Sequence, residues 1–375
     1  MPADRPYLCA VPILTAFTSP RGGFRNCCAT HPPVESHAEE SFDQWWNGQP
    51  LADFRARLQQ PNLPGECYRC ELAEQAKQHS FRTAVNSQVD QDHLTVGWPS
   101  RWNIQFGNLC NLACWTCSEK SSSRIEQHKR SLNLLPVDFV SPDLSFDQRW
   151  DDIKQSILKS YLYHDQVELT VLGGEPMYNP RLIDFLAELR TQGLASRTRL
   201  EFHTNGTKFT RRIAEILSPH TWHYICIFVS LDSVGKRAEW LRYGCSWSDI
   251  ETNLARLRAA ANYTEVHCTL SILNIMDLEA LKIFCQQQDL PLKVFPLATP
   301  EHMALNNWDG DPQLILAKIP VRDPDFDVYY RMIGQTARSG SQKAVRDYIH
   351  QFDNLRRPLQ DFNPDLHAIL HENSG

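Results

Sequence analysis

Residues 110–117 read C-N-L-A-C-W-T-C and follow a short apolar run, Trp102–Phe106. The three cysteines, Cys110, Cys114 and Cys117, are spaced C-x3-C-x2-C, so one short loop carries three thiols. Three thiolates can hold three corners of an iron–sulfur cube and leave the fourth iron without a protein ligand. Such a cluster can bind and reduce a small molecule at its open iron. The loop therefore predicts an iron–sulfur site with one open position.

A second motif supports this interpretation. Gly173, Gly174, Glu175 and Pro176 directly follow another apolar run, Val167–Leu172. Together, the two motifs resemble those of the radical S-adenosylmethionine (radical SAM) superfamily. The resemblance implies that the open iron chelates SAM, that an electron from the 4Fe-4S cluster cleaves SAM to a 5′-deoxyadenosyl radical, and that this radical removes hydrogen from a substrate. Dehydrogenation, epimerisation or cross-linking of a peptide, sugar or aminocyclitol would fit.

The central part of the chain alternates apolar strand runs with amphipathic helices, which is typical of parallel βα units in an α/β fold. We expect helices over 180–192, 249–261 and 277–288. Six such units are two short of a closed eight-unit barrel, and the resemblance implies a partial (βα)6 TIM-like barrel. The six expected strands are Trp102–Phe106, Val167–Leu172, Leu200–Thr204, Tyr224–Leu231, Val266–Leu273 and Leu292–Pro296.

Polar residues recur at every second position of three of these strands. A purely structural parallel strand is apolar on both faces, so this alternation predicts a polar barrel lumen that holds substrate and SAM. Some of these polar side chains could equally be satisfied core residues. The residues concerned are Asn103 and Gln105, Glu168 and Thr170, and Glu201, His203 and Asn205.

The resemblance also implies contacts to SAM. The family usually has a hydrophobic or aromatic residue before its last cysteine, whereas this chain has Thr116 there and Trp115 one position earlier. Gly173 and Gly174 would let the backbone approach the ligand, Glu175 would accept a hydrogen bond from the methionyl ammonium, and Pro176 would stiffen the turn. Further contacts to the ribose and carboxylate of SAM are implied for Thr204, Asn205, Ser230, Asp232 and Arg242.

Five further cysteines lie near the N-terminus, including C-x2-C at Cys67 and Cys70. With Trp45 and Trp46 they resemble the SPASM or twitch module, which binds an auxiliary 4Fe-4S cluster, although that module normally follows the barrel. Four ligands close a cubane, and we choose Cys9, Cys27, Cys67 and Cys70, with Cys28 as a neighbour or substitute for Cys27. A zinc site with four cysteines fits the same spacing.

Composition limits the remaining possibilities. The net charge of −6 gives no support for nucleic-acid binding. No segment approaches the ~20 apolar residues of a membrane span, and the apolar run Leu8–Phe17 lacks the basic cluster of a signal peptide. Twelve cysteines in a chain without a secretory signal favour reduced thiols and metal ligation. We therefore expect a cytoplasmic protein that takes electrons from an external donor such as flavodoxin or ferredoxin.

Three zones follow from these patterns. Residues 1–92 form the expected auxiliary-cluster module, 93–300 the radical SAM partial barrel, and 301–375 a helical extension. Two other functions remain open at this point. The chain could be a zinc-stabilised, non-catalytic binding or scaffold protein, or a radical SAM enzyme that transfers a group to its substrate.

Overall fold

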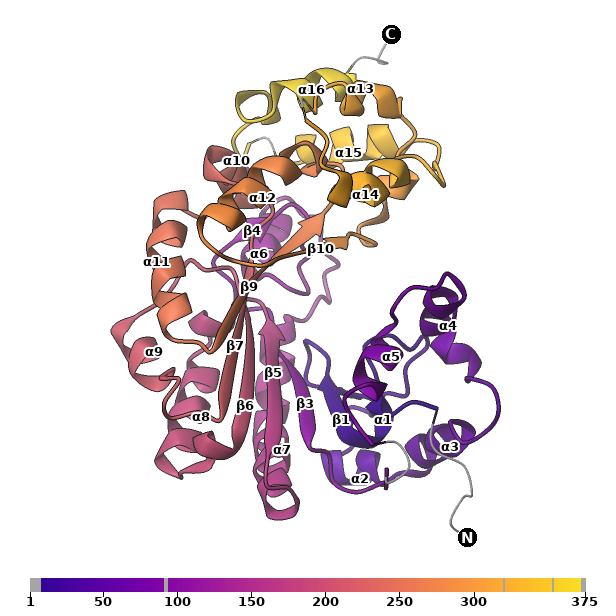
Figure 1. Cartoon of the computed structure of the whole chain (residues 1–375), viewed down its shortest axis with the longest axis vertical. Helices are drawn as coiled ribbons and strands as arrows, with labels where there is room; N and C mark the ends of the chain where they lie inside the picture. Colours follow the sequence, from indigo (N-terminus) through magenta and orange to yellow (C-terminus); the bar gives the residue numbers. More distant parts are fainter. Residues whose placement is uncertain (1–7, 91–93, 320, 353, 372–375) are drawn as a thin grey trace.

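Six parallel strands form the centre of the computed structural model, which describes residues 8–90, 94–319, 321–352 and 354–371 (Figure 1). Each strand pairs in parallel with the next along the chain, in the order β3-β5-β6-β7-β9-β10. This sequential order is the winding of a barrel, since a doubly wound sheet reverses direction at its middle. The strands are β3 (Arg101–Phe106), β5 (Val167–Gly173), β6 (Thr198–Thr204), β7 (Tyr224–Ser230), β9 (Tyr263–Leu270) and β10 (Leu292–Pro296).

All six strands expected from the sequence are present, and the α/β class is confirmed. Most connections contain a helix, as parallel neighbours require. Figure 1 shows α8, α9 and α11 along one side of the sheet. The helices of this part are α6 (Ser123–Ser131), α7 (Pro142–Tyr163), α8 (Pro180–Thr191), α9 (Arg211–Ile216), α10 (Gly235–Leu241), α11 (Trp247–Ala259) and α12 (Leu278–Gln287).

The sheet has eight strands, two more than the six expected for the barrel; the turn residues Pro20–Gly23 indicate two short strands here, but not that they join the barrel sheet. The additional strands come from the N-terminal segment: β1 (Thr15–Thr18) pairs in parallel with β3, and β2 (Phe24–Arg25) pairs antiparallel with β1. Strands this short leave little periodic signal in a sequence. As a consequence, the cysteine-containing N-terminal segment is joined to the edge of the barrel sheet by backbone hydrogen bonds.

The N-terminal segment has a small apolar core of its own. Buried Phe54, Leu58 and Val85 surround Cys9 and Cys27 there, and this core is separate from the large one between the central sheet and its helices. Figure 1 shows these indigo to purple helices at the side of β1, opposite α8 and α9. They are α1 (Val11–Leu14), α2 (Phe42–Trp46), α3 (Gln49–Arg57), α4 (Tyr68–Gln75) and α5 (Phe81–Asn86).

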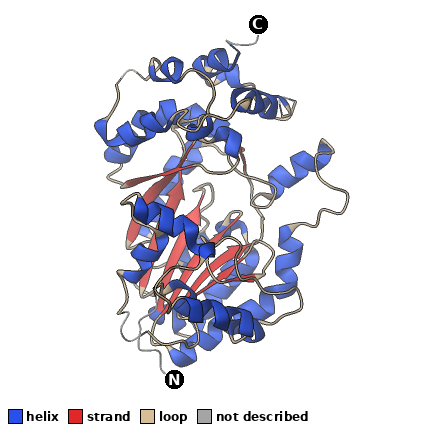
Figure 2. Ribbon diagram, turned by 90° about the vertical axis from the view of Figure 1, so that its right-hand side faces the viewer, coloured by secondary structure: helices blue, strands red, loops and turns tan. Residues whose placement is uncertain are grey.

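The described residues beyond 300 form helices and turns without a strand, as the loss of the strand pattern predicts. They gather beside α10 and α12 at one end of the molecule (Figures 1 and 2). Asp311 caps α13 with its side chain, and Gly340 begins α15 with a φ of +85°. These helices are α13 (Pro312–Leu316), α14 (Asp327–Met332), α15 (Ser341–His350) and α16 (Pro364–His371).

Candidate active site

The loop with three cysteines follows β3 and is fixed by a short two-stranded sheet. In this sheet β4 (Ala113–Cys114) pairs antiparallel with β8 (Arg242–Tyr243), so that Cys114 lies opposite Arg242. The amide of Trp115 donates to the carbonyl of Leu241 at 3.0 Å, which continues this pairing. The loop that presents the thiols is therefore held by the segment that follows α10.

The three thiols differ in their electrostatic surroundings. Burial raises the pKa of Cys110 to about 12. The thiol of Cys114 hydrogen-bonds to Cys117, which raises the pKa of Cys114 and lowers that of Cys117. Arg242 favours the thiolate form at all three positions. A thiolate is the form that binds iron, so a positive charge here suits a metal-binding loop.

A cavity of about 250 Å³ brings most of the predicted barrel-site residues together at the carboxyl ends of the strands, although Asp232 is not among those that line it. The end of a barrel strand is where substrates and cofactors bind in barrel enzymes. Besides the three cysteines, the predicted residues that line this cavity are Thr116, Gly173, Gly174, Thr204, Asn205, Ser230 and Arg242. Gln105, His203 and Thr269 line it as well.

Gly173 and Gly174 are required by contacts within the protein. A Cβ on Gly173 would lie 2.8 Å from the backbone nitrogen of Phe106, and its φ is +134°. A Cβ on Gly174 would overlap the carbonyl oxygen of Leu109 and lie 2.6 Å from the carbonyl carbon of Asn108. The sequence analysis explains these glycines by the approach of a ligand. The structure adds that any side chain here would push the cysteine loop away from β5.

Glu175 is only 1% exposed, and three donors from the protein surround its carboxylate. The hydroxyl of Thr204 donates to Oε1 at 2.7 Å, the amide of Asn205 to Oε2 at 2.6 Å, and the amide of Met177 to Oε1 at 3.1 Å. Burial raises the pKa of Glu175, while these hydrogen bonds oppose the rise. The carboxylate thus ties the end of β5 to the end of β6, and Glu175 is not among the residues that line the cavity.

Asp232 and Arg242 form a buried ion pair with an N–O distance of 2.9 Å. Asp232 also accepts a hydrogen bond from the amide of Thr269 at 2.9 Å. Within the described residues, Nε of Arg242 is buried without a hydrogen-bond partner. Arg242 lines the cavity next to the cysteines, so one of its donors remains available for an anionic group there.

Two predicted residues point elsewhere. Trp115 is 1% exposed and packs against Trp240 with ring centroids 5.1 Å apart, on the side of the C-terminal helices. Pro176 begins a short 3-10 helix, Pro176–Tyr178, and is buried. Neither lines the cavity, whereas Thr116, at the position before the last cysteine, does.

Sequence reasoning missed a hydrogen-bond network that braces the cysteine loop against β6. The side-chain amide of Asn205 donates to Oδ1 of Asn111 at 3.0 Å, and the side-chain amide of Asn111 donates to the hydroxyl of Thr207 at 3.0 Å. Asn205 also lies 3.9 Å from the sulfur of Cys110. Asn111 lies within the cysteine motif, but single polar residues in a loop give no sequence signal of such a role.

The inner face of the sheet forms a larger cavity of about 720 Å³, and His203 lines both cavities. The expected alternation is observed: in β6 the half-buried positions 199, 201 and 203 face this lumen, and their neighbours are buried. Glu201 pairs with Arg199 at 3.0 Å. Predicted lumen residues at this cavity are Asn103, Glu168, Thr170, Glu201 and His203, and the sequence analysis missed Arg101, Arg199, His267 and Lys293.

Four N-terminal cysteines also meet. Cys9, Cys27, Cys67 and Cys70 line one cavity of about 20 Å³ with largely apolar walls. Burial raises the pKa of Cys9 and of Cys67 to about 12. A hydrogen bond from the Cys28 thiol lowers the pKa of Cys27 to about 7. Cys28 itself is exposed and does not line the cavity.

The cysteine cavity and the lumen share a wall. Phe81, at the start of α5, lines both of them. Phe17 of β1 lies against it, with ring centroids 6.2 Å apart, and faces the lumen as well. The pairing of β1 with β3 therefore places the four N-terminal thiols next to the barrel interior.

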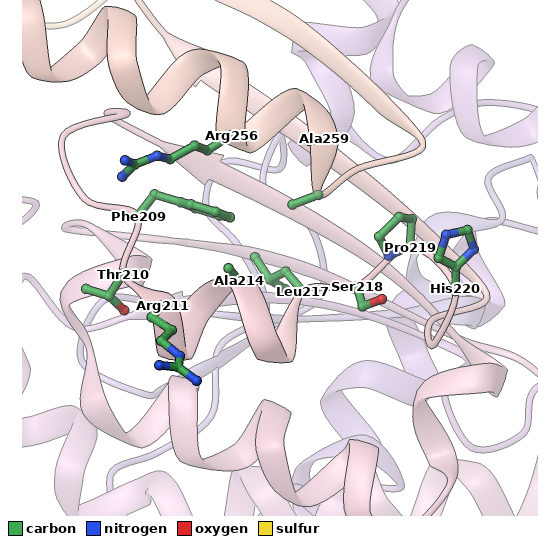
Figure 3. A pocket seen from close by; sticks show the side chains of 11 residues that line it. Phe209, Thr210, Arg211, Ala214, Leu217, Ser218, Pro219, His220, Arg256 and Ala259 are labelled. Atoms are coloured by element: carbon green, nitrogen blue, oxygen red, sulfur yellow. The ribbon is translucent and has the colours of Figure 1, made fainter.

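A fourth hollow, of about 630 Å³, lies outside the barrel between α9 and α11 (Figure 3). Phe209, Arg211 and Arg256 are among its lining residues, and the figure shows both arginines at one end. It contains none of the predicted site residues. The cavity at Cys110, Cys114 and Cys117, by contrast, combines thiols with polar residues at the ends of barrel strands.

All twelve cysteines are free thiols. Within residues 8–90, 94–319, 321–352 and 354–371, the structure contains no group of three or more His, Cys, Asp or Glu side chains placed closely enough to bind a single metal ion. Over the same ranges, the helices are too short or too polar to cross a membrane.

The chain is similar to several solved structures. Among solved structures, the chain is similar to anSMEcpe with bound AdoMet, at 16% identity and a TM-score of 0.42 over 69% of this chain and 63% of that one. It is also similar to Streptococcus suis SuiB bound to S-adenosylmethionine, at 15% identity and a TM-score of 0.37 over 79% and 61%. The chain thus spans about three fifths of the length of these two structures.

A search of curated proteins finds no match. Residues 104–281 match the model of the Radical SAM superfamily, which includes both the cysteine loop and the Gly173–Pro176 turn. This match covers slightly less than half of the chain. The chain therefore contains a Radical SAM superfamily domain over residues 104–281.

Proposed function

We propose that this chain is a radical SAM enzyme that removes hydrogen from a polar substrate in the barrel lumen. One observation carries the proposal: the three thiols of the Cys110–Cys117 loop share a cavity with the ends of β5, β6 and β7, and His203 connects this cavity to the lumen. A cofactor in the first cavity would therefore face a substrate in the second.

The residues present fit a 4Fe-4S cluster and SAM. Cys110, Cys114 and Cys117 would hold the cluster, and the free Nε donor of Arg242 would face its negative charge or the SAM carboxylate. When bound, these groups would supply an electron that cleaves SAM to methionine and a 5′-deoxyadenosyl radical able to take hydrogen from carbon. Thr116, Asn205 and Ser230 offer short polar groups for the sugar and amino-acid parts of SAM.

The lumen favours a polar substrate. Its acidic groups are paired with cations, as in Arg199–Glu201 at 3.0 Å. Burial lowers the pKa of His203 and of His267 to about 4, so both imidazoles are neutral at pH 7 and offer one donor and one acceptor each. Phe228 stacks on His267 with centroids 4.5 Å apart. A peptide, sugar or aminocyclitol would find both hydrogen bonds and flat apolar surface here.

The four N-terminal thiols support an auxiliary 4Fe-4S cluster on Cys9, Cys27, Cys67 and Cys70, in a SPASM/twitch-like module. Four cysteines leave no iron open, and the cavity is small and largely apolar, which suits electron transfer better than substrate binding. The shared wall at Phe81 supports transfer between this group and the lumen. An external one-electron donor, such as flavodoxin or ferredoxin, would complete the system.

The central test is the iron content and SAM cleavage of anaerobically purified protein. Wild-type protein should hold close to eight irons, the sum for two cubane clusters. Changing both Cys114 and Cys117 to Ala should remove about half of that iron and all reductive SAM cleavage. Cys285→Ala removes a buried thiol outside both cysteine groups and should leave the iron content unchanged. Full iron content in the double variant would refute the assignment of the loop.

The same preparation distinguishes the alternatives. Zinc without iron or sulfide would identify a zinc-stabilised scaffold, and transfer of a group from SAM to the product would identify a transferase. Changing Cys67 and Cys70 to Ala should preserve SAM cleavage with a chemical reductant but abolish product formation. Product formation without the auxiliary cluster would contradict its role in electron transfer.

A further inference from the structure

Arg356 is a buried arginine that has no hydrogen-bond partner for its guanidinium among the described residues. It follows α15 in the C-terminal region, and only 4% of its surface is exposed. Within the described residues, all three guanidinium nitrogens are buried without a hydrogen-bond partner. An unpaired buried charge is costly, and such groups in proteins normally have a partner of opposite charge or a bound ligand.

The surroundings of Arg356 explain where its charge acts. The guanidinium carbon lies 4.0 Å from the centre of the Trp115 ring and 4.5 Å from that of Phe352. Trp115 is one of the two residues between the proposed ligands Cys114 and Cys117. The Tyr243 ring, at 5.8 Å, belongs to the strand that pairs with the cysteine loop.

Electrostatic interactions agree with this geometry. Burial lowers the pKa of Arg356 to about 10, and the nearby Tyr348 and Cys114 oppose this effect. Arg124 is the charged group that repels it. Tyr348, Cys114 and Tyr243 favour the charged form of Arg356, in this order, and Cys114 is the one of these three that is a proposed cluster ligand.

We propose that Arg356 is a counter-charge for the anionic iron–sulfur cluster at Cys110, Cys114 and Cys117, supplied by the C-terminal helical region. This inference rests on the proposed function. Each electron added to the cluster adds a negative charge, and a fixed positive charge in a low-dielectric site stabilises the reduced form more than the oxidised form. Arg356 therefore raises the reduction potential of this cluster and makes the C-terminal helices part of the active site.

The test is an EPR-monitored redox titration of the anaerobic, full-length protein with dithionite as reductant. Arg356→Met keeps a long apolar side chain and removes the charge, so the potential of the barrel cluster should become more negative. The barrel signal is the one that disappears in the Cys114→Ala/Cys117→Ala variant. The auxiliary signal should keep its potential. Arg357→Gln removes the neighbouring, exposed charge and should shift neither signal.

A merely structural role would give a different pattern. If Arg356 acts only by packing on Trp115, the Met variant lowers the thermal stability of the metal-free protein and leaves the potential unchanged. A counter-charge predicts the reverse: the metal-free Met variant unfolds at the same or a higher temperature, because a costly unpaired charge is gone. An unchanged potential in a Met variant that holds its cluster overturns the inference.

Arg356→Lys provides the second arm, since it keeps the charge and loses the planar stacking. Its potential should stay near the wild-type value. If the Met variant loses the barrel iron while the Lys variant keeps it, the charge is confirmed as the stabilising element; loss from both variants overturns the proposal. A wild-type protein without any barrel-cluster signal would instead refute the proposed function, so the two failures are distinguishable.

Discussion

Replacing Glu175 distinguishes two roles of its carboxylate, one suggested by its sequence motif and the other by the structure. The sequence resemblance assigns its carboxylate to the ammonium of SAM, whereas the structure surrounds it with Thr204, Asn205 and Met177. We expect Glu175→Ala to destabilise the metal-free protein in the absence of SAM. The physical reason is that two backbone amides and one hydroxyl would lose their acceptor in a site that is 1% exposed.

The magnitude follows from these three bonds. A hydrogen bond to a charged group contributes about 1.5–3 kcal/mol, and an unsatisfied buried donor costs about 1–3 kcal/mol. The desolvation that raises the pKa of Glu175 offsets part of this gain. We therefore expect a loss of roughly 3–4 kcal/mol in the free energy of unfolding for the Ala variant. Glu175→Gln should lose about half of that, because its amide nitrogen cannot accept from the donor on its side.

The assay is urea unfolding of the metal-free protein, followed by tryptophan fluorescence and far-UV circular dichroism. Glu251→Ala, on the exposed side of α11, is the matched control and should change stability by less than about 0.5 kcal/mol. Wild-type stability in the Ala variant, combined with a loss of SAM affinity in calorimetric titration of the holoprotein, would refute the structural role. The carboxylate would then be reserved for SAM, as the motif alone suggests.

Three further predictions use other parts of the site. Gly174→Ala should lower stability by about 1–3 kcal/mol and reduce iron retention at the barrel site, since its Cβ would overlap the carbonyl of Leu109; normal iron content and stability would show that the loop can move aside. His203 and His267 have folded pKa values of about 4, below the ordinary value of 6.5, so their contribution to stability should fall as the pH drops from 6.5 towards 4. Each contributes at most about 3 kcal/mol, and the pH dependence of urea unfolding in His203→Asn should be weaker than in wild type; an identical dependence would contradict the buried neutral state. Finally, the thiol of Cys245 donates to the carbonyl of Ala238 at 3.7 Å, so Cys245→Ser should keep all barrel iron, and loss of iron would make Cys245 a fourth ligand that closes the site.

The sequence predicts those parts of the fold that depend on periodicity and local spacing. The six barrel strands and the helices over 180–191, 247–259 and 278–287 are confirmed within a few residues, because their apolar patterns extend over several turns or alternations. The run Pro20-Arg21-Gly22-Gly23 indicates a tight turn between two short strands, and β1 and β2 flank it in the structure. Their pairing with β3 depends on tertiary contacts that a linear pattern does not contain.

The candidate site shows the same division between local and long-range information. Residues at strand ends, such as Asn205 and Ser230, could be placed in one cavity because the carboxyl ends of neighbouring parallel strands meet at one edge. The orientation of a single side chain could not be obtained in this way. Glu175 turns under the loop to meet the end of β6, and Trp115 turns outward to the C-terminal helices, although both lie within motifs whose sequence suggests contact with a ligand.

Arg356 lies at the limit of what a sequence can reveal. It is separated from Cys117 by more than half of the chain, and the run Leu355-Arg356-Arg357-Pro358 resembles an ordinary exposed turn. Only the packing of Phe352 and Arg356 on Trp115 distinguishes the buried arginine from its exposed neighbour. Trp115 lies between two of the proposed ligands, and its ring packs against Phe352 and Arg356. This packing is the contact between the C-terminal region and the cysteine loop that explains an aromatic residue at position 115.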